Sequence, residues 1–297
     1  MNRVDIVIPT YNHARFLGEA LRSVIGQTME SWRAIIVNNF STDDTHDVVA
    51  AFSDPRIGIV DFANHGIIAA SRNHGLSLAT APYVAFLDSD DSWYPDKLAR
   101  CVAALDAGAD IVCHGERWTS TDGTHRDVAY GPEHNARYRR LLFRHNCVST
   151  SAVVARRDLL SDVHGFDERP EFVTAEDYDL WLRLARQGAR YVFIPDMLGV
   201  FRRHEASASA AVERNAAAEL AVVNAHVAEL PASLVTRVCH RHRRARVAYS
   251  AARSHQVTGH RSQALRRYVE CLYTSPFVLR AWVGLALLLA PTKAARR

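Results

Sequence analysis

The chain has few cysteines, and they show no pairing pattern. It contains five cysteines in 297 residues, and no two of them stand in a C-x-x-C pair. An odd number without such pairs argues against a disulfide scaffold and against a zinc site, and favours a reduced, cytosolic protein. The first residues, MNRVDIVIPTYN, carry only a short apolar run and no cleavage site, so no secretory signal is predicted.

A glycine-rich loop is missing where two nucleotide-using classes would need one. The first apolar run ends in Pro9-Thr10-Tyr11-Asn12 rather than in G-x-G-x-x-G, which argues against a dinucleotide-dependent oxidoreductase. A nucleotidyltransferase would also be expected to carry a glycine-rich phosphate loop there. Hydrophobic residues still make up 48% of the chain, enough for a large core.

No apolar run is long enough to span a membrane. The last apolar stretch, Pro276–Ala290, falls short of the roughly twenty residues that a span needs, and it contains Arg280. From Arg237 onward there are 13 basic residues and one acidic residue, Glu270, so this tail carries about +12 and the rest about −8. Two interpretations remain open: an interfacial helix in peripheral contact with a membrane, or a helix packed on the protein or on a second subunit of a homodimer. Nucleic acid is not predicted as a partner.

What is present indicates an α/β domain with a mostly parallel sheet. Short runs rich in Val and Ile predict strands at Val4–Ile8, Ala34–Val37, Ile57–Val60, Tyr83–Leu87 and Asp110–Cys113. Helical patterns lie between them at Phe16–Ile25, Thr45–Phe52, Ile67–Leu78 and Asp96–Asp106. We predict a first domain over residues 1–208 and a helical extension over 209–297. The extension should contain a helical hairpin at Ala245–Leu272 with Gly259 at its turn.

Three carboxylates crowd the end of the strand at Tyr83–Leu87. The stretch Asp88-Ser89-Asp90-Asp91 follows this strand directly. A turn and the start of the next helix account for one or two of these acids. A divalent cation, which prefers hard oxygen ligands, would account for all three. The stretch alone leaves both explanations open.

Four segments, in this order, resemble the family 2 glycosyltransferases over roughly residues 1 to 205. They are VDIVIPTYN, AIIVNNFSTDDT, AASRNHGLSLATAPYVAFLDSDDSWYPDKL and AEDYDLWLRLARQG. The family comprises inverting enzymes of the GT-A fold that use nucleotide-diphospho-sugars. The resemblance implies a Rossmann-like GT-A domain that moves a sugar, with Mn²⁺ or Mg²⁺, to a hydroxyl of a saccharide or glycolipid acceptor.

The resemblance also implies roles for the acids. Asp90 matches the direct metal ligand, Asp88 lies beside the ribose and the metal, and His204 is a further candidate ligand. The metal would neutralise the charge that develops on the leaving nucleoside diphosphate. Asp177 matches the catalytic base, and Glu176 would contact the acceptor or support Asp177. Both acids could instead simply begin a helix.

The donor's nucleoside is expected at the ends of the first two strands. The residues assigned to this part of the site, with the neighbouring phosphate contacts, are Pro9, Thr10, Tyr11, Asn38, Asn39, Arg72, Asp88 and Ser89. Asn38 and Asn39 depart from the Asp-Asp of the family. An amide that both accepts and donates favours uracil or thymine over guanine. The departure also leaves room for an alternative, a non-catalytic, membrane-docked protein that binds nucleotide sugars. Acceptor specificity is expected in the loops Glu116–Asn135 and Pro170–Thr174.

Overall fold

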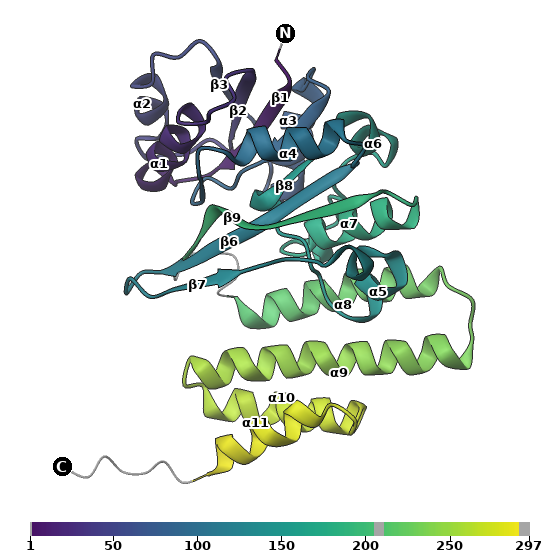
Figure 1. Ribbon diagram of the computed structural model, residues 1–297. Helices are drawn as coiled ribbons and strands as arrows, with labels where there is room; N and C mark the ends of the chain where they lie inside the picture. Colours follow the sequence, from purple (N-terminus) through teal and green to yellow (C-terminus); the bar gives the residue numbers. More distant parts are fainter. Residues whose placement is uncertain (1, 205–210, 291–297) are drawn as a thin grey trace, which may run out of the picture.

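The computed structural model describes residues 2–204 and 211–290 (Figure 1). Its centre is a mixed sheet with the strand order β3-β2-β1-β4-β8-β6-β9-β5, and β7 pairs with β6. The strands are β1 Val4–Thr10, β2 Trp32–Asn38, β3 Ile57–Asp61, β4 Tyr83–Phe86, β5 Ser92–Trp93, β6 Ile111–Ser120, β7 His125–Val128, β8 Val153–Arg156 and β9 Tyr191–Arg203. The predicted α/β fold class is confirmed.

Helices cover both faces of this sheet, which explains why its central strands are continuous apolar runs. All seven residues of β1 are buried. One face packs against α1 Ala14–Ile25, α2 Thr45–Ala50 and α4 Lys97–Asp106. The other packs against α3 Ile68–Leu78, α5 Tyr138–Phe143, α6 Arg157–Asp162 and α7 Glu176–Arg186.

The five predicted strands are all present, as β1, β2, β3, β4 and β6, and they run parallel to one another as predicted. β3, β2, β1 and β4 pair in parallel, and so do β6 and β9. β8, β5 and β7 pair antiparallel with their neighbours. Since β1, β2 and β4 run in the same direction, the residues that follow them meet at one edge of the sheet.

The rest of the described chain is helical: α8 Val212–Ala228, α9 Leu234–Val257, α10 Arg261–Thr274 and α11 Leu279–Leu289. β9 ends at Arg203 and α8 begins at Val212, so the predicted boundary between 208 and 209 lies outside the described residues. The predicted hairpin is confirmed as α9 and α10, with Gly259 at φ +80°, a conformation that favours glycine.

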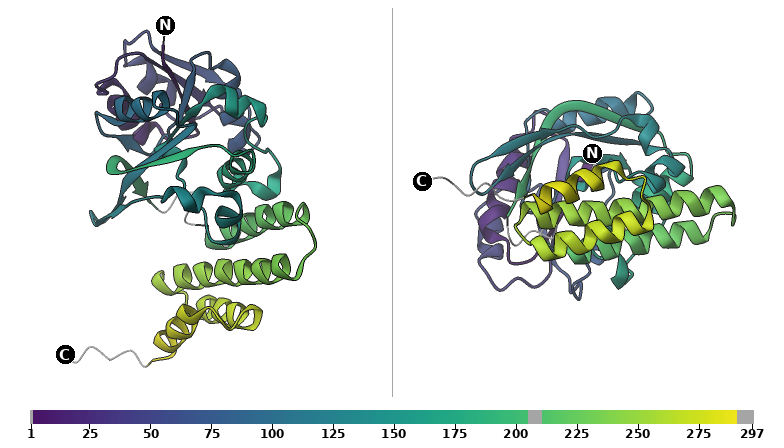
Figure 2. Two further views of the ribbon diagram at one scale, coloured as in Figure 1. Left: turned by 45° about the vertical axis from the view of Figure 1, so that its right-hand side comes forward. Right: turned by 90° about the horizontal axis from the view of Figure 1, so that it is seen from below.

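The four C-terminal helices form a stack that leads away from the sheet (Figures 1 and 2). α8 packs against the sheet's own core through Ala218, Val222 and Val223. α11 lies at the far end of the stack, where Gly284 allows close contact: a Cβ at this position would lie 2.3 Å from Tyr268 Oη. None of the described helices is long and apolar enough to cross a bilayer.

Candidate active site

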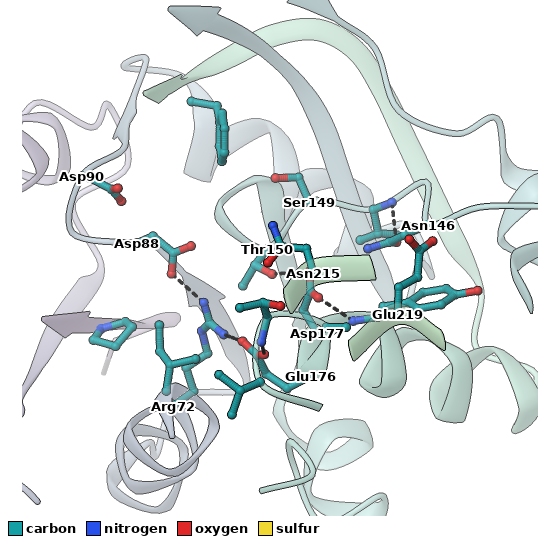
Figure 3. Close-up of a pocket in the computed structure, with 18 of the residues that line it drawn as sticks. Arg72, Asp88, Asp90, Asn146, Ser149, Thr150, Glu176, Asp177, Asn215 and Glu219 are labelled. Carbon is teal, nitrogen blue, oxygen red and sulfur yellow. Dashed lines mark hydrogen bonds and ion pairs between the residues drawn. The ribbon is translucent and has the colours of Figure 1, made fainter. Parts of the chain in front are cut away.

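A cavity of about 910 Å³ lies at the carboxyl edge of the sheet, and most of the predicted site residues line it. These are Pro9, Thr10, Tyr11, Asn39, Arg72, Asp88, Ser89, Asp90, Glu176 and Asp177. They come from strand ends and helices that are up to about 170 residues apart in the chain, and the fold brings them to one place. Figure 3 shows Asp88 and Asp90 on one side and Asp177 on the other.

A buried arginine joins the two sides of this cavity. Arg72, on α3, is 4% exposed and donates to Asp88 Oδ1 at 2.7 Å and to Glu176 Oε1 at 2.5 Å (Figure 3). Burial disfavours its charge, but the two carboxylates outweigh burial and raise the pKa of Arg72. The bridge therefore fixes a residue of the strand-end acid cluster relative to the first residue of α7.

Asp177 is held in the cavity wall as a carboxylate with an unusual pKa. Its Oδ2 accepts a hydrogen bond from Thr150 Oγ1 at 3.0 Å, and its Oδ1 accepts from the Tyr178 N–H at 2.6 Å. Desolvation, with the nearby Glu176 charge, raises the pKa of Asp177 to about 6. The two acids do begin α7, as the helix-start explanation requires. They also face the cavity, and a carboxylate with a pKa near neutrality suits general-base chemistry.

The three clustered carboxylates have different partners, which is why they can lie so close together. Asp88 pairs with Arg72, whereas Asp90 Oδ2 lies 2.9 Å from His204 Nε2. Asp91 is 3% exposed and does not line the cavity. It accepts from the backbone N–H of Arg202 at 2.9 Å and so ties this loop to the end of β9. Burial, with the charge of Asp90, raises the pKa of Asp91.

The arrangement at Asp90 fits a partial metal shell. Within residues 2–204 and 211–290, no group of three His, Cys, Asp or Glu side chains is placed to hold a metal ion. Asp90 and His204 nevertheless put a carboxylate oxygen and an imidazole nitrogen side by side. Mg²⁺ and similar ions at phosphate-transfer sites take one or two carboxylates from the protein and the remaining ligands from substrate phosphates and water. The residues present are compatible with such a site.

Asn38, the last residue of β2, and Asn39, which follows it, lie in different surroundings. Asn38 is fully buried and outside the cavity: its Nδ2 donates to Asp61 Oδ1 at 2.6 Å and its Oδ1 accepts from Ser41 Oγ at 2.6 Å. Asn39 lines the cavity, and its Oδ1 accepts from the Asn64 N–H at 2.9 Å. Successive side chains of an extended strand point to opposite sides, so only one of the two residues reaches the cavity.

Tyr11 and Ser89 complete the strand-end side of the cavity. Tyr11 is 55% exposed, so its ring is free to stack on a flat ligand. The Ser89 hydroxyl lies 2.9 Å from His13 Nδ1, and this contact positions the loop between Asp88 and Asp90.

The far side of the cavity contains residues that the motifs did not identify. Trp118 comes from β6 and Tyr130 from the segment after β7. Asn146 comes from the segment after α5, and Arg214 and Glu219 come from α8. The predicted specificity loops do contribute, but α8 carries no recognisable motif. The Tyr130 hydroxyl donates a hydrogen bond to Oε2 of the buried Glu116 at 2.5 Å. Burial raises the pKa of the Glu116 carboxyl to about 7.

Relatives with assigned names support a glycosyl transfer reaction. The chain is 29% identical over 184 residues to the UDP-Glc:alpha-D-GlcNAc-diphosphoundecaprenol beta-1,3-glucosyltransferase WfgD of Escherichia coli, covering 62% of this chain and 70% of that protein. It is 30% identical over 206 residues to the amylovoran biosynthesis glycosyltransferase AmsB of Erwinia amylovora, covering 65% of this chain and 67% of that protein.

Two solved structures share the fold. S. aureus TarS in complex with UDP-GlcNAc superposes with a TM-score of 0.65 at 17% identity, covering 97% of this chain and 89% of that one. The mannosyltransferase PcManGT from Pyrobaculum calidifontis, in complex with GDP-Man and Mn²⁺, superposes with a TM-score of 0.63 at 21% identity, covering 96% of this chain and 80% of that one. At these identities the likeness shows a common fold.

The sequence model of "Glycosyl transferase family 2" matches residues 5–163, more than half of the chain. This segment contains the first four strands, Arg72 and the Asp88–Asp91 cluster. The match, the named relatives and the shared fold agree: the chain belongs to glycosyl transferase family 2.

Proposed function

We propose that the protein is a metal-dependent, inverting glycosyltransferase. It would move a sugar from a nucleotide-diphospho-sugar to a hydroxyl of a saccharide or glycolipid acceptor. The observation that carries this proposal is the Asp88–Arg72–Glu176 bridge, because it places the strand-end carboxylates and the base candidate Asp177 in one cavity. A nucleotide-sugar binder without catalytic activity would have no need for Asp177 there.

On the donor side, Asp90 and His204 would hold Mn²⁺ or Mg²⁺, and Asp88 would lie beside the ribose. When bound, the ion supplies positive charge to the diphosphate, which becomes a better leaving group. Arg72 keeps Asp88 in place through its ion pair. Ser89 and His13 hold the backbone between the two aspartates.

On the acceptor side, Asp177 would remove the proton from the attacking hydroxyl. The acceptor oxygen bonds to the anomeric carbon as the bond to the diphosphate oxygen breaks, and the proton passes to Asp177. The nucleophile attacks from the face opposite the leaving group, which inverts the configuration. Asp88 and Asp90 on one side of the cavity, with Asp177 across from them, support this single displacement.

For the donor's base, we favour uracil or thymine. The Asn39 amide NH₂ can donate a hydrogen bond to a ring carbonyl of the base. Its Oδ1 already accepts from the Asn64 N–H, and its second lone pair can accept from a ring N–H. Tyr11 offers a ring for stacking. The name of WfgD gives UDP-Glc as its donor, and TarS is bound to UDP-GlcNAc, whereas PcManGT is bound to GDP-Man.

A thermal-shift screen tests the donor side directly. UDP or dTDP with Mn²⁺ should raise the melting temperature, because a ligand at a hundred times its Kd stabilises a fold by about 2.7 kcal/mol. EDTA should abolish the shift, and so should Asp90→Asn. A shift that survives EDTA in the wild type would remove the metal from the proposal. A larger shift with GDP than with both pyrimidine nucleotides would refute the assignment of the base.

We also propose that α11 rests on an anionic membrane surface, which would give access to a glycolipid acceptor. The outward residues of α11 and the preceding turn are large and apolar, with exposed fractions from 51% to 76%: Phe277, Leu279, Trp282, Val283, Leu287 and Leu289. The opposite side of α11 packs on α9 and α10. Basic residues near an anionic leaflet contribute roughly 1 kcal/mol each, and the tail from Arg237 is strongly basic.

A further inference from the structure

Three aromatic side chains line the cavity, and the chemistry described above does not use them. Trp118 lies on β6, Tyr130 follows β7 and Phe201 lies on β9, and each of the three is half-buried. The ring centroids of Trp118 and Phe201 are 5.0 Å apart. The indole N–H of Trp118 donates a hydrogen bond to the Tyr130 hydroxyl at 3.1 Å. We call these three residues the aromatic group.

The polar atoms of Trp118 and Tyr130 are already engaged with protein partners. Tyr130 Oη accepts from the Trp118 N–H and donates its own hydrogen to Oε2 of the buried Glu116 at 2.5 Å. Burial and the Glu116 charge raise the pKa of Tyr130, so the hydroxyl keeps this hydrogen. Both hydrogen-bond donors of the pair are therefore used within the protein, and the rings offer the cavity mainly apolar surface.

The aromatic group is held in position by contacts that lie outside the cavity. The guanidinium groups of Arg126 and Arg203 lie 5.2 Å and 5.9 Å from the ring centroid of Trp118, and neither arginine lines the cavity. Such cation–π contacts favour one orientation of the indole. Glu116 does the same for Tyr130 through its hydrogen bond. Rings that are fixed in advance lose little conformational entropy when a ligand binds.

The strand pairing brings the aromatic group to the same wall as the candidate base. β6 and β8 run antiparallel with Cys113 opposite Val153, so the part of β6 that leads to Trp118 runs beside the residues before Val153. Those residues include Thr150, whose hydroxyl donates to Asp177 Oδ2 at 3.0 Å (Figure 3). A ligand that lies on the aromatic group is therefore close to the segment that holds Asp177.

We propose that the aromatic group stacks on a pyranose ring of the acceptor saccharide, and that Glu116 is a positioning residue that fixes Tyr130 for this contact. The inference rests on the proposed function and assigns residues to its acceptor subsite. A pyranose carries its equatorial hydroxyl groups around the edge of the ring, whereas axial C–H groups make its faces apolar. These C–H groups are slightly positive and the face of an aromatic ring is negative, so the two surfaces attract. A hydroxyl on the edge of the sugar would then face Asp177.

The test measures saccharide binding to the full-length protein, with UDP and Mn²⁺ present, by saturation-transfer NMR. The probes are the methyl pyranosides of glucose, galactose, mannose and N-acetylglucosamine, and sorbitol, which has hydroxyl groups but no ring. We expect a pyranoside to bind through its ring C–H protons and sorbitol not to bind. Trp118→Leu should raise the Kd of that pyranoside about twofold to tenfold, the equivalent of one aromatic contact. Trp282→Leu removes an exposed indole on α11, and this matched control should leave the Kd unchanged.

Two substitutions at Glu116 test its positioning role. Glu116→Leu removes the acceptor of the Tyr130 hydrogen bond and should raise the Kd of the pyranoside, although an apolar side chain suits this buried position and the melting temperature need not fall. Glu116→Gln keeps an acceptor oxygen and should restore binding. Equal Kd values in the two variants would overturn the positioning role.

Three outcomes would overturn the subsite: no pyranoside binds to the wild type, the Kd is the same in a folded Trp118→Leu, or the pyranoside is displaced by UDP or UDP-glucose. The donor's own sugar is the competing occupant, because Phe201 lies three residues before His204. Displacement is measured in Asp177→Asn, so that transfer does not consume the ligands. A thermal melt shows whether Trp118→Leu is folded, and the Glu116 pair decides if it is not.

A separate measurement judges the proposed function. The UDP–Mn²⁺ thermal shift should be the same in Trp118→Leu and wild type, since the aromatic group does not bind the nucleotide. If the wild type shows no such shift, the proposed donor side is at fault. The pyranoside titration, repeated without UDP, still judges the aromatic group by itself.

Discussion

The two sides of the cavity are built in different ways. The donor side consists of residues that directly follow β1, β2 and β4, together with Arg72 on the neighbouring helix α3. The acceptor side is assembled from β6, the segments after β7 and α5, the first turn of α7, and α8. A site at parallel strand ends follows from topology, whereas the second kind depends on how distant helices pack. The donor side thus depends on the sheet itself. The acceptor side depends on the loops and helices that pack beside the sheet.

The largest effect should separate the two sides. Asp177→Asn should reduce turnover by about 10²–10⁴-fold, because it removes the proposed general base but keeps the shape of the side chain. Donor binding should be unchanged, since Asp177 lies across the cavity from Asp90. Initial rates of transfer and calorimetry with UDP–Mn²⁺ measure the two quantities. Turnover within a few-fold of wild type would transfer the role to Glu176.

Arg72 is the residue that links both sides, so its removal should destabilise the whole site. Arg72→Met leaves Asp88 and the buried Glu176 without their partner, and removing one member of a buried ion pair costs roughly 3–5 kcal/mol. Urea unfolding measures this loss. Arg117→Met, which breaks the exposed pair with Asp127, is the control and should leave the free energy of unfolding almost unchanged, because solvent screens exposed pairs. Similar losses in the two variants would show that the bridge has no special role.

The pH dependence should report the acceptor side. With the pKa of Asp177 near 6, the base is protonated below that pH, so turnover should fall about tenfold per pH unit below 6. Thr150→Val removes a hydrogen bond that stabilises the carboxylate, so the pKa should rise and the acid limb should move to higher pH by up to about one unit. If turnover of the wild type falls only near pH 4, or if the pH at which it falls is the same in Thr150→Val, Asp177 is not the titrating group.

The smallest effect concerns the membrane. Val283→Glu with Leu287→Glu places two acids on the exposed face of α11, which should reduce co-sedimentation with anionic vesicles at low salt. Binding of the wild type should weaken as salt rises. Leu78→Glu, at the end of α3 in the catalytic domain, should leave vesicle binding unchanged. If the wild type does not co-sediment, the apolar face has another partner, and a second subunit becomes the next candidate to examine.

Most residues that the sequence assigned to the donor side line the cavity, because they are close to the strand ends that apolar runs reveal. Their roles stay predictions. The difference between Asn38 and Asn39 was not predicted, since it depends on the direction in which each side chain points where β2 ends. The strands β8 and β9 were also missed. They become part of the sheet by pairing with β4 and β6, and pairing across such distances leaves no local pattern.

On the acceptor side, the sequence predicted only Glu176, Asp177 and a pair of loops. α8 contributes Arg214, Asn215 and Glu219, and no motif marks them. The arginines of the tail were interpreted as solvated or membrane-facing charge. Arg243 shows why composition is insufficient: it is buried because α9 packs beside α5 and α8, where it contacts the Leu142 carbonyl and Glu219, and it also reaches Tyr178 on α7.

The contribution of α8 to the cavity has a consequence for how such enzymes diversify. The family's sequence model matches residues 5–163, and the last motif that resembles the family ends at Gly188, so both lie before α8 begins at Val212. Natural selection could therefore replace or reshape the C-terminal helices, and with them the choice of acceptor, while the donor machinery is inherited intact. An exchange of this helical stack between relatives would be a route to new saccharide linkages that requires no invention at the strand ends.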